Sequence, residues 1–158
     1  MAEGEDKTTR ALQIVKQHAL SAIGVSIVPL PLVDVALLSG IQIAMLYRLA
    51  ELYGVDFVSN ARKPVLASVL GGGLSFSLSA NLATLLRSLP RVGLIAGLIS
   101  TPLFGAAATY AVGRVFIQHF ESGSTFLTFD PQRVRAYFVE QFEAGKEEMR
   151  TSFAGIRP

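Results

Sequence analysis

Asp34 and Gln42 are the residues most able to do chemistry, because both lie in an otherwise apolar stretch of the chain. Asp34 is the only acid between Asp6 and Glu51. A carboxylate at the centre of a bilayer costs about 2.5 to 3.5 kcal/mol on insertion scales, so such a residue is often functional. At the start of a helix, the same carboxylate can instead accept hydrogen bonds from free backbone amides. The position of Asp34 after Pro31 favours this structural role.

Gln42 follows Asp34 by two turns, on a similar face of the same predicted helix. An amide side chain within an apolar helix favours a polar contact with a neighbouring helix. The alternative is that it lines a path for water or ions. Asp34 and Gln42 together form the candidate polar membrane site of this sequence.

No other group of residues indicates catalysis, a metal or a cofactor. His119 and Glu121 are too few for a zinc site, which needs three or four converging ligands, and His18 is distant in the sequence. The chain has no cysteine, which excludes thiolate ligands and disulfides. The glycines at 71–73 are not followed by the Gly-Lys-Ser/Thr of a phosphate loop. We therefore expect no enzymatic activity, no metal site and no cofactor.

Helices must position these residues, and two long runs without charge dominate the sequence, residues 65–86 and 92–113. As helices, both would be about 33 Å long, slightly more than the hydrocarbon core of a bilayer at about 30 Å. The connection at residues 87–91 is too short for a parallel return. The two runs therefore predict a central transmembrane helix hairpin with a basic tip. Pro102 should kink the second helix, which membrane helices tolerate.

Small residues recur at every fourth position along both runs. The hydrophobic effect does not drive helices together inside a bilayer, so small residues that allow close backbone approach form the association surface. We expect these stripes to pack helices within the hairpin or between copies, which predicts a homo-oligomer, whereas the lining of a pore is the alternative. A water-soluble core fits poorly, since glycine costs about 1 kcal/mol against alanine in a helix. The predicted packing positions are Gly71, Ser75, Ser79, Gly93, Gly97, Thr101, Gly105, Thr109 and Gly113.

The N-terminal third predicts a second hairpin. Residues 1–6 are acidic and polar, so we expect them to be disordered and not to begin a cleavable signal peptide. Residues 7–54 predict two helices with a tip at Pro29 and Pro31, because proline lacks an amide hydrogen and restricts its predecessor. The uncharged run before Pro29 is short, so this hairpin could be interfacial, re-entrant or spanning. Gly54 should end its second helix.

The C-terminal part predicts a loop and an amphipathic helix. The central hairpin, residues 64–122, should stop at Gly123, and residues 123–158 follow. Asp130 before Pro131 is a good helix start, because the carboxylate can cap free amides while proline occupies the first turn. We expect the last helix to pack on the protein rather than to anchor it. The predicted fold class is all-α: an integral membrane protein with both hairpins and this C-terminal amphipathic helix.

Composition agrees with a membrane protein. Hydrophobic residues make up 51% and charged residues only 16%, with a mean hydropathy of +0.46. The net charge of +2 is too small to indicate nucleic-acid binding, which needs a clustered basic face. Basic residues are more numerous on the side of the predicted hairpins that carries both termini. The positive-inside rule therefore places both termini in the cytoplasm, at a bacterial inner membrane.

Two sequence blocks resemble a known bacterial family. One is Ile-Val-Pro-Leu-Pro-Leu-Val-Asp at 27–34, followed by Gln42 and Met45, and the other is Phe-Ile-Gln-His-Phe-Glu-Ser-Gly at 116–123. With these blocks, residues 11–146 are similar to the YcjF-related membrane domains of unknown function, which are often fused to or found beside Era-like GTPase domains. The resemblance implies a helical cytoplasmic-membrane protein and an Era-like GTPase as a partner, but no reaction. Unlike the fused members, this sequence contains no nucleotide-binding domain.

These observations predict a non-enzymatic integral membrane protein that self-associates and acts as a membrane scaffold or remodelling subunit coupled to a GTPase. Its expected partners are the lipid bilayer, further copies of itself and the Era-like GTPase, with no nucleic acid. The alternative function is an oligomeric channel or transporter for ions or small solutes, in which Asp34, Gln42 and Pro102 would take part. A soluble helical bundle that binds a hydrophobic ligand is a third hypothesis.

Overall fold

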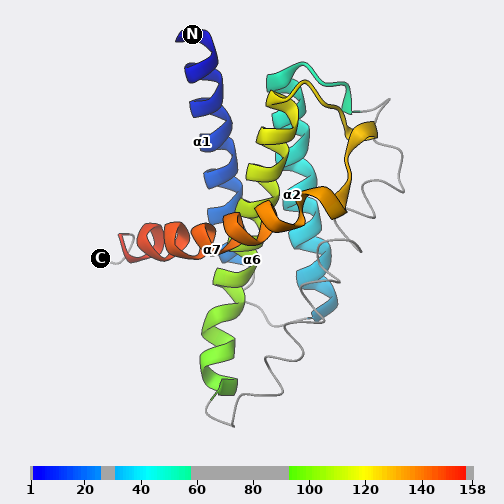
Figure 1. Cartoon of the computed structure of the whole chain (residues 1–158). Coiled ribbons are helices and arrows are strands. Elements are labelled where there is room, and N and C mark those ends of the chain that lie inside the picture. The colour runs from blue at the N-terminus through cyan, green and yellow to red at the C-terminus, as the bar shows by residue number, and fades with distance from the viewer. Residues whose placement is uncertain (1, 26–30, 58–92, 156–158) are drawn as a thin grey trace.

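The described part of the chain is all-helical, and the computed structural model describes residues 2–25, 31–57 and 93–155. Figure 1 shows α1, α2 and α6 side by side, with α1 running antiparallel to the other two and α7 lying across them. The elements are α1 (Ala2–Val25), α2 (Pro31–Tyr53), α6 (Gly93–Glu121), the short 3-10 helix η2 (Phe126–Thr128) and α7 (Pro131–Ala154).

Helix α6 is the centre of the bundle, because α1, α2 and α7 all pack against it. Its buried residues lie around most of its circumference between Gly105 and Phe120. Gly113 marks the closest approach of α1. A Cβ atom at Gly113 would lie 2.7 Å from Cγ1 of Val15 and 3.1 Å from Sδ of Met45. A side chain does not fit there, so glycine sets the spacing of three helices.

Gly145 marks a second close approach, where α7 crosses α6. A Cβ atom at Gly145 would lie 2.9 Å from Cδ1 of Tyr110 and 3.1 Å from the carbonyl oxygen of Ala107. The close approaches at Gly113 and at Gly145 thus involve the same short part of α6. Apolar side chains complete the crossing, since the rings of Phe104 and Phe142 pack 5.1 Å apart.

The helix ends follow local sequence signals, as predicted. Helix α2 begins at Pro31 and α7 begins at Pro131. Gly54 and Gly123 follow the ends of α2 and α6 with φ of 70° and 75°, a left-handed conformation that glycine adopts without a steric cost. The amide of Gly123 donates to the carbonyl oxygen of Phe120 at 2.9 Å and so closes the last turn.

The membrane-spanning part of the predicted fold class is wrong. Among the residues that the structure describes, no helix is long and apolar enough to cross a bilayer. The second helix of the predicted transmembrane hairpin corresponds to α6, whose apolar character instead serves protein packing on three sides. A helix that is apolar all round can be the centre of a protein core as well as a membrane span. The first predicted span, residues 65–86, lies outside the described residues.

Two further sequence predictions can be compared with the described helices. In the region of the predicted N-terminal hairpin, α1 and α2 run antiparallel and contact each other, and both pack on α6. Helix α1 starts earlier than predicted, at Ala2, and so includes residues 2–6, which were expected to be disordered. Alanine and glutamate in this segment are good helix formers, which explains the longer helix.

Candidate functional site

A polar junction joins three helices at the end of the bundle that carries the N-terminus. Oε1 of Glu121 on α6 accepts hydrogen bonds from the hydroxyl of Thr8 on α1 at 2.7 Å and from the hydroxyl of Tyr53 on α2 at 2.9 Å. Nζ of Lys7 lies 5.5 Å from the centroid of the Tyr53 ring, within the range of a cation–π contact. We call Thr8, Tyr53 and Glu121 the polar junction.

The hydrogen bond to Glu121 and partial burial keep Tyr53 protonated. Burial raises the pKa of Tyr53 well above its ordinary value, and the carboxylate of Glu121 raises it further as hydrogen-bond acceptor and nearby negative charge. Tyr53 therefore stays a neutral hydrogen-bond donor at physiological pH. Its hydroxyl thus links α2 to α6 through Glu121.

An aromatic cluster continues the polar junction and fastens the segment after α6. The ring of Phe116 stacks on Phe129 with centroids 4.7 Å apart, and Phe126 contacts both Phe120 and Phe57 at 5.1 and 5.3 Å. Nε2 of His119 donates to the carbonyl oxygen of Thr125 at 2.8 Å. His119 is therefore occupied with the loop that leads to α7.

His119 and Glu121 thus have separate partners and are not brought together as ligands. Within residues 2–25, 31–57 and 93–155, no three His, Cys, Asp or Glu side chains are grouped so that they could hold a metal ion. In the same residues, every buried side-chain nitrogen or oxygen has a hydrogen-bond partner. The polar atoms inside this part of the protein are all used for internal bonds.

Gln42 makes a polar contact between α2 and α6 inside the core. Its buried Nε2 donates to Oγ1 of Thr109 at 3.4 Å, and that hydroxyl donates in turn to the carbonyl oxygen of Gly105 at 2.9 Å. Asp34 lies in the first turn of α2, about 12 Å along the helix axis from Gln42. The side chain of Asp34 lies outside the described part, whereas that of Gln42 is occupied within the bundle.

The predicted small-residue positions fall into three groups. Gly105, Thr109 and Gly113 are buried inside the chain by its own helices. Gly93, Gly97 and Thr101 belong to the first part of α6, where side chains are not described. Gly71, Ser75 and Ser79 lie outside the described residues.

One surface that sequence reasoning missed is the side of α2 that faces away from the bundle. Three large apolar side chains on it are exposed by 47%, 39% and 51%, those of Leu37, Ile43 and Tyr47. In the sequence, residues 35–47 are one run without charge. The signal that could have separated the two faces is the spacing of three and four residues. We call this surface the outer face of α2, and it consists of Leu37, Gly40, Ile43, Ala44 and Tyr47.

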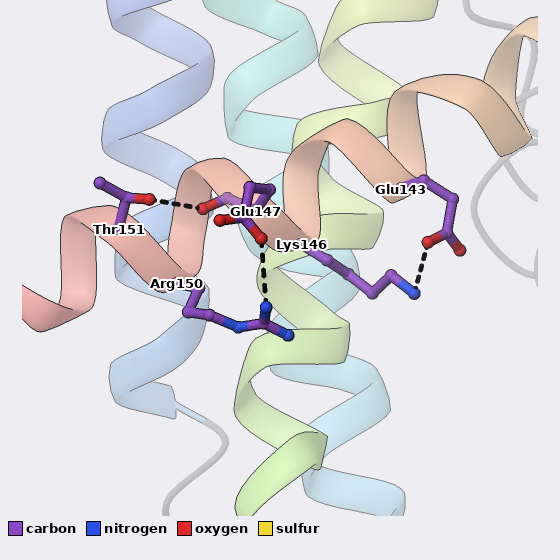
Figure 2. A network of polar contacts seen from close by, with 5 residues as sticks. All are labelled: Glu143, Lys146, Glu147, Arg150 and Thr151. Atoms are coloured by element: carbon purple, nitrogen blue, oxygen red, sulfur yellow. Dashed lines mark hydrogen bonds and ion pairs between the residues drawn. The ribbon is translucent and has the colours of Figure 1, made fainter.

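The exposed side of α7 is different, because its charges pair with one another. Figure 2 shows Lys146 bound to Glu143 at 2.6 Å and Arg150 bound to Glu147 at 3.1 Å, each three residues apart on the helix. The hydroxyl of Thr151 donates to the carbonyl oxygen of Glu147 at 3.0 Å. These pairs leave α7 with a polar, locally neutral outer surface.

Two polar contacts then hold α7 against the bundle. Nζ of Lys16 on α1 lies 2.7 Å from Oε1 of Glu148, and Nε of Arg114 on α6 donates to Oε1 of Gln141 at 3.0 Å. The last helix packs on the protein, as its amphipathic sequence predicted.

Comparison with known proteins identifies the family. The model of the family described as "Domain of unknown function (DUF697)" matches residues 5–146. The chain belongs to the DUF697 family. It is also similar to magnetosome membrane protein 22 of Magnetospirillum gryphiswaldense, with 38% identity over 137 residues that cover 86% of this chain and 70% of the relative. No solved structure matches the chain.

Membership of DUF697 confirms the sequence resemblance at the level of a family of unknown function. The narrower link to YcjF-related domains and Era-like GTPases stays a prediction. In this DUF697 chain, the polar junction and the Gln42 contact are helix fasteners. The outer face of α2 holds three of the five large hydrophobic side chains that are exposed in the described residues.

Proposed function

We propose that this DUF697 protein is a non-enzymatic, membrane-associated protein that self-associates as a scaffold or remodelling subunit. Membrane association is supported by 38% identity to a relative named as a magnetosome membrane protein. The observation that carries the proposal is the contrast between a polar interior spent on internal bonds and an uncharged, exposed face on α2. The apolar side of a surface helix can lie against a membrane surface.

The test of membrane association is flotation of the purified full chain with vesicles of phosphatidylcholine and phosphatidylglycerol in equal parts. We expect the protein to move with the vesicles to the top of a density gradient. Protein that stays at the bottom with intact vesicles in the upper fraction contradicts the proposal. Our further expectation of an inner-membrane location with cytoplasmic termini is tested by protease protection in cells.

Self-association is the second part of the proposal. The chain's own helices already bury Gly105, Thr109 and Gly113. Contact between copies is therefore expected to use the early part of α6. We expect Gly97→Leu to lower the mass of the vesicle-bound assembly in cross-linking experiments. Gly24→Leu is the matched control, because no atom lies within 4 Å of a Cβ placed at Gly24. An unchanged mass of the Gly97→Leu assembly would contradict contact between copies through the early part of α6.

Coupling to an Era-like GTPase is the third part, and its support is the sequence resemblance alone. A GTPase partner should be retained by the vesicle-bound protein in one nucleotide state and released in the other. Equal retention with GDP and with a non-hydrolysable GTP analogue would argue against coupling.

A further inference from the structure

We propose that the outer face of α2 contacts the lipid bilayer directly, with α2 lying along the membrane surface. This inference rests on the proposed membrane association and names the surface that achieves it. Leu37, Gly40, Ile43 and Tyr47 follow one another at spacings of three, three and four residues, so they share one side of the helix. Their exposed fractions show that the described part of the bundle leaves this side largely open, although the Tyr47 ring also contacts the ring of Phe57 at 5.6 Å.

The opposite side of α2 holds the helix firmly in place. Met45, Leu46 and Leu49 are fully buried in the core, and Gln42 is bonded to Thr109 on α6. The outer face is therefore presented by a helix whose rotation is fixed by packing. An apolar side that is rigidly held outward needs no refolding to meet a membrane.

Among the side chains that the structure describes, no other helix presents a comparable face. Three of the five large hydrophobic side chains that are exposed in the described residues belong to α2. The other two, Val139 and Phe153, are far apart on α7, where ion pairs such as Lys146 with Glu143 surround them. On α1 the exposed positions carry polar and charged side chains, among them Arg10 and Gln17.

The composition of the outer face suits the boundary between lipid and water. Charge is absent between Asp34 and Arg48, so no charged residue lies within the outer face. Tyr47 combines an apolar ring with a polar hydroxyl, which is the kind of side chain found at the headgroup level. Exposed Arg48 beside it can approach anionic headgroups, and exposed Glu51, one turn after Tyr47 on the same side, marks where the apolar face ends.

The size of the outer face favours lipid over a second copy of the chain. From residue 37 to 47 the helix is about 15 Å long and about 10 Å wide, which gives an area of about 150 Å². A stable protein interface needs about 800 Å² on each partner. A bilayer accepts a short apolar helix side without a matching shape, so it is the occupant that this face fits.

The test uses the absence of tryptophan from the chain, because a single introduced tryptophan then reports its own surroundings. Tyr47→Trp places the reporter on the outer face, and Val139→Trp places the control on an exposed position of α7. With vesicles of phosphatidylcholine and phosphatidylglycerol, we expect the emission of Tyr47→Trp to shift to shorter wavelength and to be quenched by lipids brominated on their chains. The emission of Val139→Trp should not change.

A second pair of variants measures the contribution of the outer face to binding. The double variant Leu37→Gln with Ile43→Gln should bind vesicles about tenfold more weakly or worse, because two half-exposed apolar side chains lose their transfer into the bilayer. Val139→Gln should bind like the unmodified protein. Circular dichroism of all variants checks that the helices remain folded.

The outcomes separate this inference from the proposed function. Flotation of the Tyr47→Trp protein without quenching would overturn the assignment of the outer face while membrane association stands. Quenching of Val139→Trp but not of Tyr47→Trp would show that α7, not α2, contacts the bilayer. A concentration-dependent blue shift of Tyr47→Trp without vesicles would identify a second copy as the occupant and also overturn it. Absence of flotation would overturn both proposals.

Discussion

Replacing Gly113 with alanine should destabilise the protein, although alanine is the better helix former. The new Cβ atom would lie 2.7 Å from Cγ1 of Val15 and 3.1 Å from Sδ of Met45, so α1 and α2 would have to move away from α6. Overpacking of a core typically costs about 1 to 3 kcal/mol. The helix propensity of alanine returns about 1 kcal/mol of this. The net effect is a loss of up to about 2 kcal/mol in the free energy of unfolding.

Gly40→Ala is the matched control, because Gly40 lies within α2 and no atom is within 4 Å of its added Cβ. This variant should gain about 1 kcal/mol from helix propensity alone. Denaturant unfolding followed by circular dichroism compares the two. The stabilities of the variants should differ by about 1 to 3 kcal/mol, the cost of the close contact.

A Gly113→Ala variant as stable as the Gly40→Ala control would refute the view that α1 and α6 touch at Gly113. A rescue experiment sharpens the test further. Val15→Ala removes both methyl groups that crowd the new Cβ, so the double variant Val15→Ala with Gly113→Ala should lose less than the sum of the single losses. Additive losses would mean that the two residues do not contact each other.

Other contacts give further predictions. Because burial and Glu121 raise the pKa of Tyr53 in the folded protein, the stabilisation linked to its proton is complete below the ordinary value of 10.0 and is lost as pH rises above it. Stability should therefore fall above pH 10, and unfolding of Tyr53→Phe at several pH values should show a weaker fall. Glu121→Gln should let Tyr53 ionise at lower pH, as measured by ultraviolet absorbance. An unchanged titration of Tyr53 would contradict its contact with Glu121. Lys16→Met should cost less than about 1 kcal/mol, because its ion pair with Glu148 is well exposed. Gly145→Ala should cost up to about 2 kcal/mol, because pressing on α6 costs about 1 to 3 kcal/mol and helix propensity returns about 1 kcal/mol. Limited proteolysis before α7 should become faster in this variant, and a stability as high as that of Gly40→Ala would contradict the crossing geometry.

Helix ends could be predicted from sequence because their causes are local. Pro31 and Pro131 begin helices since the missing amide hydrogen is not needed in the first turn. Gly54 and Gly123 follow helix ends because a left-handed residue is required there. Each signal depends on a few neighbouring residues, so a single sequence contains it.

The surroundings of α6 could not be predicted in the same way. Residues 92–113 carry no charge, and such a helix can be surrounded equally well by lipid or by three packed helices. Composition alone does not distinguish these two environments. The length of the run favoured lipid, which was wrong. The same ambiguity hid the outer face of α2, because Met45 and Tyr47 are two residues apart yet lie on opposite sides of the helix.

The polar junction was beyond sequence reasoning for a different reason. Thr8 and Tyr53 are separated from Glu121 by 113 and 68 residues. Threonine, tyrosine and glutamate are common on helix surfaces, and no spacing connects them. Only the packing of α1 and α2 on α6 shows that one carboxylate oxygen serves both hydroxyls.

The pairing of α1 with α6 has a consequence for synthesis on the ribosome. The hydrogen bond between Thr8 and Glu121 spans 113 residues, and translation at about 5 to 20 residues per second needs about 6 to 23 seconds to cover that distance. Throughout that interval the nascent chain carries the apolar side of α1, with Val15 at its middle, before α6 has been made. The N-terminal helix therefore completes its packing among the last steps of folding, and chaperones or a nearby membrane can meet its apolar side first.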